Sequence, residues 1–204
     1  RDRGLLPVTQ QAPPELAARL LRLPRTRLTL LAGIDGRGAA GKSTLARAVA
    51  ALLPAATVVE FDDFYLPSAK RELRRREGDD EVGGDFDWRR LRDEVLAPLD
   101  RDAPSRYRRY DWVSDRLAEW HTIAPGGVVL VEGNYTTRAE LRAFYDLTVW
   151  VEAPHELRLR RGVERDGTGS REQWLEQWMP EEERYIAAQD PRRWVDVVVE
   201  SPVS

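Results

Sequence analysis

The feature that most constrains this chain is the segment at residues 36–44, which reads Gly-Arg-Gly-Ala-Ala-Gly-Lys-Ser-Thr. It fits a pattern of Gly, any four residues, Gly, Lys and then Ser or Thr. Because glycine has no Cβ, the backbone N–H groups of such a loop can point inward at phosphate oxygens. Lys42 would place its charge beside the β- and γ-phosphates, and the Ser43 hydroxyl is a hard oxygen ligand suited to Mg²⁺. The loop residues expected to contact phosphates are Gly36, Gly38, Ala39, Ala40, Gly41, Lys42, Ser43 and Thr44.

The segments on either side of the loop support this interpretation. Residues 28–34 form a short apolar run, which is typical of a buried parallel strand. Residues 44–53 have helical composition and end at Pro54. A helix that begins at the loop adds the partial positive charge of its N-terminus to a phosphate site. The alternative is a glycine-rich turn that binds nothing.

Four further apolar runs predict the rest of a sheet. They lie at residues 57–61, 127–133, 147–151 and 194–199. Helical segments alternate with them, at residues 14–23, 137–145, 154–166 and 171–188 and in a helix that opens after Asp87. This alternation predicts an α/β fold with a five-stranded, doubly wound parallel sheet and right-handed crossovers. The whole chain, 1–204, is expected to be one domain, with residues 1–13 as a loose arm.

Composition excludes several classes of protein. The chain has 204 residues, 42% hydrophobic and 33% charged, which is typical of a soluble globular domain. Its formal net charge of −3 gives no indication of a nucleic-acid or anionic-membrane partner. It has no cysteine, so disulfides and thiolate chemistry are excluded. No secretory signal is visible, and no apolar run approaches the roughly 18 residues that span a bilayer. The cytoplasm is the expected compartment.

Acidic residues follow two of the predicted strands. Asp62 and Asp63 come directly after residues 57–61, and Glu132 ends the run at 127–133. Ligands of open α/β sheets lie outside the carboxyl ends of the strands. We therefore expect Glu132 to hold Mg²⁺ and at least one of the two aspartates to act as a metal ligand or base. The alternatives are a turn or helix cap for the aspartates and a salt bridge for Glu132.

Two segments between the strands are harder to assign. Residues 68–84 are highly charged, which favours a solvated, mobile insertion over a flap near an acceptor site. Residues 103–123 are rich in arginine and aromatic residues and predict a hairpin. Its aromatic side chains form a small core of their own or stack on a flat heterocycle. His121 is expected to face solvent rather than to take part in catalysis.

The helix at 154–166 carries a row of arginines. Arg158, Arg161 and Arg165 are spaced by three and four residues, so they share one face. Together with Gly167 and Gly169, this predicts a lid over residues 154–170 that closes on a triphosphate and neutralises its charge. The alternative is a solvated, salt-bridged helix face. In the next helix, the aromatic residues are expected to be core rather than ligand contacts; they are Trp174, Trp178 and Tyr185.

Taken together, these motifs resemble the uridine–cytidine kinase branch of the P-loop kinases, a group that includes phosphoribulokinase and bacterial pantothenate kinase. The resemblance covers roughly residues 28–200, and the motifs occur in the family's order. They are the phosphate loop, Asp62-Asp63-Phe64-Tyr65, Phe86-Asp87, the hairpin Tyr110-Asp111-Trp112-Val113-Ser114-Asp115, Glu132-Gly133, the arginine lid and the terminal Trp194 to Val199.

The resemblance implies a role for each matched residue. Asp62 would be the general base and a metal ligand, with Ser43 and Glu132 serving Mg²⁺. Lys42, Arg161 and Arg165 would be catalytic, and Arg158 would contact the phosphates of ATP. The implied contacts to the acceptor are Asp62, Tyr65, Asp87, Tyr110, Trp112, Asp115 and Arg161. Relatives in this family often self-associate, so a homo-oligomer is also implied.

The chain departs from the family pattern at two places. The hairpin histidine that reads a pyrimidine edge is replaced by Asp115, which accepts hydrogen bonds where a neutral histidine can donate. Residues 134–137 are more polar than in the family. We therefore predict an ATP- and Mg²⁺-dependent kinase of a small hydroxyl compound, in first place a nucleoside.

Two alternatives stay open. One is a kinase for a non-nucleoside such as pantothenate or a sugar phosphate. A phosphorylated acceptor would need a basic cluster, which Arg106, Arg108 and Arg109 would supply. The other is a nucleotide-binding switch with slow hydrolysis, although the chain has no Asn-Lys-x-Asp guanine signature.

Overall fold

The computed structural model describes residues 7–8 and 12–201. All five predicted strands form and lie parallel in one sheet, which confirms the predicted α/β fold. A two-residue strand extends the sheet at one edge, so that the order is β1-β8-β7-β2-β6-β3. The strand bounds are β1 Pro7–Val8, β2 Leu30–Gly36, β3 Ala56–Glu60, β6 Val128–Glu132, β7 Leu147–Glu152 and β8 Val197–Glu200.

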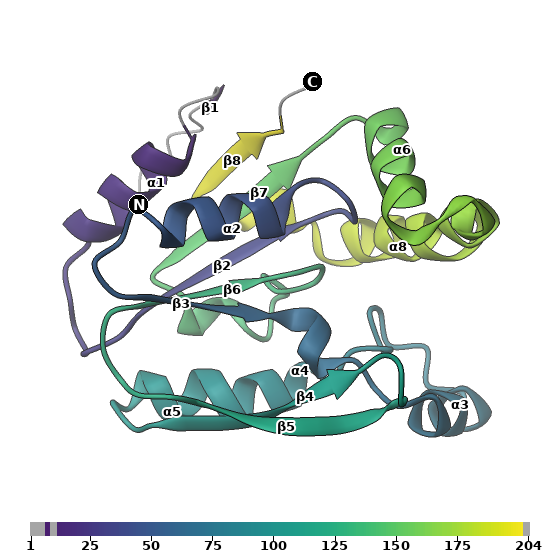
Figure 1. Ribbon diagram of the computed structural model, residues 1–204, viewed down its shortest axis with the longest axis horizontal. Coiled ribbons are helices and arrows are strands. Elements are labelled where there is room, and N and C mark those ends of the chain that lie inside the picture. Colours follow the sequence, from purple (N-terminus) through teal and green to yellow (C-terminus); the bar gives the residue numbers. More distant parts are fainter. Residues whose placement is uncertain (1–6, 9–11, 202–204) are drawn as a thin grey trace.

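Helices cover both faces of the sheet (Figure 1). On one face lie α1 (Ala12–Arg22) and α2 (Lys42–Ala50), whose apolar side chains pack with those of β2, β7 and β8. On the other face a continuous helix over residues 88–100 joins α4 (Trp88–Arg90), the π-helical turn Leu91–Leu96 and α5 (Ala97–Asp100). The hairpin of β4 (Ser105–Asp111) and β5 (Arg116–Ile123) lies beside that helix.

The remaining helices lie at the end of the sheet where the phosphate loop is found (Figure 1). They are α6 (His155–Asp166), α7 (Arg171–Gln173), the π-helical turn Trp174–Trp178 and α8 (Met179–Gln189). The short helix α9 (Pro191–Trp194) instead leads into the beginning of β8, where the Asp196 N–H donates to Thr148 near the beginning of β7. Short 3₁₀ turns occur at Phe61–Phe64, Arg142–Phe144 and Thr168–Ser170. Among the described residues, no helix combines the length and the apolar character needed to cross a bilayer.

Register brings the predicted acids to one edge of the sheet. Glu60 of β3 is the partner of Glu132 of β6, which in turn lies beside Ile34 of β2. Because parallel strands end at the same edge, the phosphate loop after β2 and the acids after β3 and β6 meet there. The core on both faces is apolar, and side chains such as Leu31, Val131 and Trp150 are almost fully buried.

Several predicted boundaries were wrong. The helix expected at 137–145 is only the 3₁₀ turn Arg142–Phe144, because the backbone N–H groups of Leu141, Phe144 and Tyr145 bond to carbonyls three residues back instead of four. Trp194 ends α9 and is 44% exposed, so the last strand begins later, at Val197. The segment 68–84 contains helix α3 (Ser68–Arg76).

The expected loose arm is also partly ordered. Pro7 and Val8 pair with β8, and α1 already begins at Ala12. The other residues of that arm, 1–6 and 9–11, lie outside the described residues.

Candidate active site

The phosphate loop joins β2 to α2 and needs glycine at defined positions. Gly36 has φ +149°, and a Cβ there would lie 2.4 Å from the carbonyl oxygen of Val151. Gly41 has φ +103° and forms the N-cap of α2. L side chains rarely adopt such dihedral angles. The loop therefore holds its backbone at the N-terminus of α2, where the helix dipole favours an anion.

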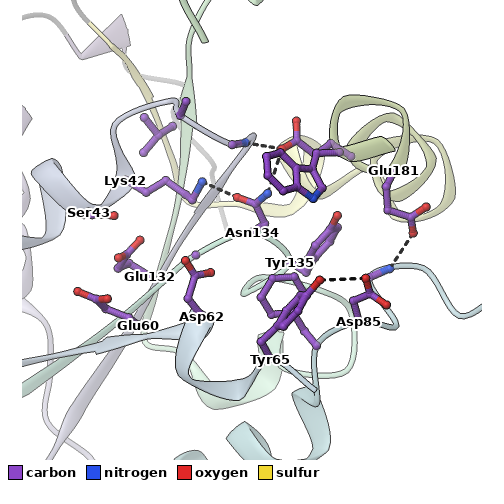
Figure 2. Close-up of a pocket in the computed structure, with 18 of the residues that line it drawn as sticks. Lys42, Ser43, Glu60, Asp62, Tyr65, Asp85, Glu132, Asn134, Tyr135 and Glu181 are labelled. Carbon is purple, nitrogen blue, oxygen red and sulfur yellow. Dashed lines mark hydrogen bonds between the residues drawn. The ribbon is translucent and has the colours of Figure 1, made fainter. Parts of the chain in front are cut away.

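The loop opens on a cleft of about 1630 Å³. Figure 2 shows side chains of the loop, of the turn after β3, of the loop after β6 and of α8 around it. Of the residues predicted for the site, the described lining includes Gly38, Ala39, Gly41, Lys42, Ser43, Thr44, Asp62, Tyr65, Trp112, Glu132, Arg161 and Arg165. A cleft of this size has room for a nucleoside triphosphate and a small second substrate.

Lys42 is held inside the phosphate loop. Its side chain is 7% exposed, and Nζ donates to the carbonyl of Arg37 at 2.8 Å and to Oδ1 of Asn134 at 2.6 Å (Figure 2). Burial lowers the pKa of Lys42, and the nearby carboxylates, Glu132 first, oppose that shift. An incoming phosphate would offer the ammonium a charged acceptor in place of these neutral ones.

A buried carboxylate that was not predicted from the sequence reaches the same loop from α8. Glu182 is 3% exposed and accepts from the Gly38 N–H at 2.6 Å, from Nδ2 of Asn134 at 3.0 Å and from Nη1 of Arg158 at 2.9 Å. A Cβ on Gly38 would lie 2.6 Å from Oε1 of Glu182, so the loop needs glycine there as well. Glu182 occurs within a run of three glutamates, and nothing in that run marks it out.

Arg158 is therefore a structural partner of Glu182 rather than part of the open cleft. It is 2% exposed, and it is not among the described residues that line the cleft. This differs from the expectation that it contacts phosphates. The physical reason is that Arg158 lies on the side of α6 that packs inward, where an unpaired carboxylate would be costly to bury.

Asp35 was missed as well. It is fully buried at the end of β2 and accepts from the backbone N–H groups of Gly36, Tyr135 and Thr137 at 2.7–3.0 Å. The hydroxyls of Thr137 and Tyr185 also donate to it, at 2.7 and 2.8 Å. Burial raises the pKa of Asp35, and these hydrogen bonds oppose the shift. The position of an acid at the end of an apolar strand was the signal that could have identified Asp35. Its hydrogen bonds hold the loop after β6 against the phosphate loop.

The acids at the edge of the sheet face Ser43 (Figure 2). Glu132 is 5% exposed; burial raises its pKa, while Lys42 and the Ser43 hydroxyl oppose the shift. Asp62 faces the open cleft. Desolvation raises the pKa of Asp62, and the charges of Lys42 and Arg165 oppose the shift. Hard oxygen donors of this kind fit Mg²⁺, which usually takes one or two carboxylates together with waters and phosphate oxygens. In the described ranges, no three acidic or histidine side chains already form a metal cluster.

The predicted lid brings two arginines to the cleft. Arg161 donates from Nη1 to the Ser201 hydroxyl at 2.9 Å, and Arg165 pairs with Asp166 at 2.8 Å. Trp174 donates from its indole N–H to Asp166 at 3.0 Å and packs on Gly162, where a Cβ would lie 2.4 Å from the ring. Trp174 and Trp178 line the cleft, so the expectation that they belong to the core holds only in part.

Aromatic side chains form the opposite end of the cleft. The Tyr65 ring stacks on Trp112, with centroids 4.5 Å apart and planes at 28°. The Tyr65 hydroxyl donates to Oδ2 of Asp85 at 3.1 Å (Figure 2). Phe86 and Tyr135 complete this wall. Asp85 is an acid that sequence reasoning missed, because it precedes the Phe86-Asp87 motif instead of belonging to it.

Three residues expected to bind the acceptor lie elsewhere. Asp87 is the N-cap of the helix at 88–100, where Oδ1 accepts from the Arg90 N–H at 3.2 Å. Tyr110 is buried and donates to Asp115 at 2.7 Å, and Asp115 accepts from the backbone N–H of Ser68 at 2.9 Å. None of the three is among the described residues that line the cleft. Asp115 ties the hairpin to the start of α3.

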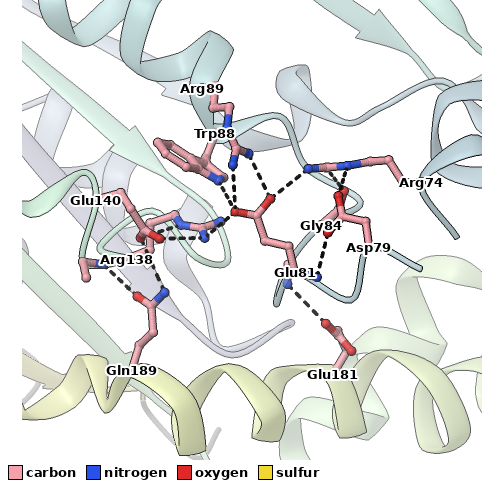
Figure 3. Close-up of polar contacts among 12 residues, drawn as sticks. Arg74, Asp79, Glu81, Gly84, Trp88, Arg89, Arg138, Glu140, Glu181 and Gln189 are labelled. Atoms are coloured by element: carbon pink, nitrogen blue, oxygen red, sulfur yellow. Dashed lines mark hydrogen bonds and ion pairs between the residues drawn. The ribbon is translucent and has the colours of Figure 1, made fainter. Parts of the chain in front are cut away.

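The segment after α3 is a loop held against the cleft, which favours the flap over a mobile insertion. Glu81 accepts from Arg74 at 2.8 Å, from the Trp88 indole at 2.8 Å, from Arg89 at 2.9 Å and from the buried Arg138 at 3.2 Å (Figure 3). Burial would raise the pKa of Glu81, but the hydrogen bonds from Arg89 and Trp88 and the charge of Arg138 outweigh it and lower the pKa to about 2. We call residues 77–86 the flap. Seven of its residues line the cleft: Asp79, Asp80, Glu81, Gly83, Gly84, Asp85 and Phe86.

The flap is also tied to the lid side of the cleft. The Gly83 N–H donates to Glu181 of α8 at 3.2 Å (Figure 3). The flap therefore contacts the helix that carries Glu182.

Comparisons with known proteins agree with this geometry. The sequence pattern of the family described as Phosphoribulokinase / Uridine kinase matches residues 31–201. The chain is 27% identical over 139 residues to uridine-cytidine kinase C of Dictyostelium discoideum, covering 67% of this chain and 30% of that protein. It is 25% identical over 136 residues to a uridine kinase of Borrelia garinii, covering 66% of each. The chain thus spans less than two thirds of the length of these relatives.

Solved structures share the fold. A protein described as a possible uridine kinase from Bacillus stearothermophilus superposes with a TM-score of 0.72 at 20% identity, covering 93% of this chain and 98% of that one. A Silicibacter protein, whose name refers to a fructose transport system kinase, gives 0.74 at 23% identity, covering 94% and 99%. A D-glycerate 3-kinase from Cryptococcus neoformans gives 0.55 at 17%, covering 78% and 76%. The same fold therefore occurs under names that refer to different acceptors.

Proposed function

We propose that this chain, which belongs to the phosphoribulokinase / uridine kinase family, is an ATP-dependent kinase that phosphorylates a hydroxyl group of a small molecule. One observation supports the proposal above the others. Lys42 in the phosphate loop and Asp62 after β3 line the same cleft, whose far wall is aromatic. A phosphate cradle, a carboxylate and a separate organic pocket are the parts that phosphoryl transfer to an acceptor needs.

In the proposed reaction, the acceptor hydroxyl attacks the γ-phosphorus in line. A new bond forms between the acceptor oxygen and phosphorus, the bond to the leaving oxygen of ADP breaks, and the hydroxyl proton passes to the Asp62 carboxylate. Asp62 is exposed in the cleft, so its carboxylate is open to an acceptor hydroxyl. Lys42 holds charge on the transferred phosphate, and Arg161 and Arg165 approach it from the lid.

Mg²⁺ is expected to be bound with ATP, where it would neutralise charge on the phosphates. Ser43, Glu132 and Asp62 are the oxygen donors that this chain offers to it. The loop residues Gly36 to Thr44 would hold the phosphates through their backbone N–H groups, with Ala39 and Ala40 among them.

Names of the relatives make a nucleoside the first acceptor to test. A non-nucleoside acceptor is the second candidate, because Asp87, Tyr110 and Asp115 do not line the described cleft. The test is ATP consumption with Mg²⁺ in the presence and absence of acceptors of several classes. Consumption that depends on an acceptor is the expected result. Equal consumption without any acceptor would instead favour a nucleotide-hydrolysing switch.

A further inference from the structure

The arginines at the acceptor end of the cleft are paired with carboxylates or carbonyls of the protein. Arg74 pairs with Asp79 and with Glu81, both at 2.8 Å. Arg75 pairs with Asp85 at 3.3 Å. A phosphate or carboxylate on the acceptor would compete with these carboxylates for the guanidinium groups, which bind such anions through their N–H donors.

The other two arginines there are engaged as well. Arg71 donates to the carbonyl of Leu66 at 3.0 Å and lies over the ring of Tyr65, 4.7 Å from its centroid. Arg184 pairs with Glu181 at 2.8 Å. Within the part of the chain that the structure describes, every arginine at the acceptor end already has a protein partner.

The basic cluster proposed for a phosphorylated acceptor is not at the cleft. Arg106 lies over the Trp120 ring, 4.2 Å from its centroid. Arg108 donates to the carbonyls of Leu117 and Ala118, and Arg109 pairs with Glu119 at 2.6 Å. None of these three arginines is among the described lining residues. The arginines at the acceptor end are thus balanced by carboxylates of the protein, which favours an uncharged acceptor over an anionic one.

The hairpin offers little with which to recognise a nucleobase. Both oxygens of Asp115 are used by Ser68, and Oδ1 also accepts from Tyr110. Trp112 is the hairpin residue that lines the cleft within the described ranges, and its ring already stacks on Tyr65. Centroids 4.5 Å apart leave no gap for a base between these two rings. A base needs polar partners for its edge as well as a stacking face.

The polar groups beside the aromatic wall, on Asp85 and Tyr135, suit a compact polyhydroxy compound. Asp85 keeps lone pairs beyond those used by Tyr65 and Arg75, and a carboxylate can accept from two neighbouring hydroxyls. The Tyr135 hydroxyl has no hydrogen-bond partner among the described residues, and its ring lines the same wall. Glu81 and Glu181 fix the flap that carries Asp85 (Figure 3). Aromatic faces beside a few fixed polar groups form a site for small organic ligands.

We infer that the acceptor is an uncharged polyol without a nucleobase, of the monosaccharide class, which Asp85, Tyr65 and Tyr135 hold by its hydroxyl groups against the aromatic wall. This inference rests on the proposed function, since it names the acceptor of that reaction. Asp85 is a specificity residue here and takes no part in proton transfer.

The experiment measures initial rates with ATP and Mg²⁺ for four acceptor classes. The probes are neutral monosaccharides (fructose, glucose and ribose), nucleosides (uridine, cytidine and adenosine), anionic compounds (ribulose 5-phosphate, pantothenate and glycerate) and no acceptor. We expect a monosaccharide to exceed every nucleoside in kcat/KM by at least roughly tenfold, since the site lacks partners for a base. Asp85→Asn should raise the KM for that sugar by roughly tenfold or more, as expected for lost hydrogen bonds to a charged group, with the KM for ATP unchanged.

Glu77→Gln is the matched control, because Glu77 is an exposed acid of the same flap and is not among the described lining residues. It should leave both KM values unchanged. A nucleoside that matches or exceeds the sugars, or turnover confined to an anionic acceptor, would overturn the inference while keeping the proposed kinase. Acceptor-independent hydrolysis, or no turnover with any class, would count against the proposed function itself.

Discussion

The two ends of the cleft are built in different ways. The phosphate end is built around one continuous loop, residues 36–44, and the charged side chains at that loop are buried: Lys42 is 7% exposed, Glu132 of β6 5% and Glu182 of α8 3%. The acceptor end is assembled from the turn after β3, the flap, the hairpin and the loop after β6, and its Trp112 is 55% exposed. Buried charges that bond to one another tolerate few substitutions. Exposed side chains contributed by four segments can be substituted, and the ligand that they bind can thereby change, without loss of the fold.

The largest effect should come from the phosphate end. Lys42→Ala removes the ammonium that faces the transferred phosphate, and we expect kcat/KM to fall by roughly 10³, as for other removed transition-state donors. Circular dichroism should show an unchanged fold. Lys70→Ala is the control, because the chain's other lysine is exposed on α3. Near-normal turnover in the Lys42 variant would remove the basis for the proposed chemistry.

Stability should also depend most on the phosphate end. Arg158→Met leaves Glu182 buried without its charged partner, which typically costs about 3–5 kcal/mol of unfolding free energy. The exposed neighbour on the same helix, tested as Arg160→Met, should change it by less than about 0.5 kcal/mol. Urea unfolding of both variants measures the difference. Equal midpoints would mean that Glu182 and Arg158 do not depend on each other.

Asp63, in the 3₁₀ turn after β3, should make the free energy of unfolding depend on pH. Burial raises the pKa of Asp63 from 3.8 to about 6, and the Tyr107 hydroxyl, 3.2 Å away, opposes the shift. An acid whose pKa is raised by folding binds its proton more tightly in the folded state, so its contribution to stability is lost as pH rises from about 4 to 6. Asp63→Asn should therefore gain stability relative to the unmodified chain between pH 4.5 and pH 7, measured by urea unfolding.

The control for that comparison is Glu156→Gln, which removes a carboxylate whose side chain is 93% exposed. Its stability relative to the unmodified chain should not change across the same pH interval. A constant difference for Asp63→Asn as well would show that Asp63 titrates alike in the folded and unfolded chain.

The smallest effect should come from the exposed wall. Trp112→Ala removes the ring that stacks on Tyr65, and aromatic pairs contribute about 0.5–1.5 kcal/mol beyond area burial. We expect the acceptor KM to rise by roughly threefold to tenfold with the KM for ATP unchanged. Val113→Ala is the control, since Val113 is 96% exposed at the tip of the same hairpin. A larger change in the KM for ATP than in that for the acceptor would contradict the division of the cleft.

The phosphate loop, the five strands and the place of the acids that follow two of them could all be predicted from the amino-acid sequence. These features depend on short-range chemistry: glycine spacing, apolar runs, and charged residues next to strand ends. The strand order then brings Glu60 and Glu132 into register at one edge, as expected for parallel strands.

Which charged side chains face the cleft could not be predicted from the sequence, because it depends on the tertiary packing. Glu182 bonds to Gly38 across 144 positions of sequence, and Tyr185 bonds to Asp35 across 150. Asp115 accepts a hydrogen bond from Ser68, which lies 47 positions away in the sequence. Asp85 lines the cleft, where Asp87 was expected. A local motif states which residue types are present, but their partners depend on how distant segments pack, because buried polar groups must find hydrogen bonds wherever the fold supplies them.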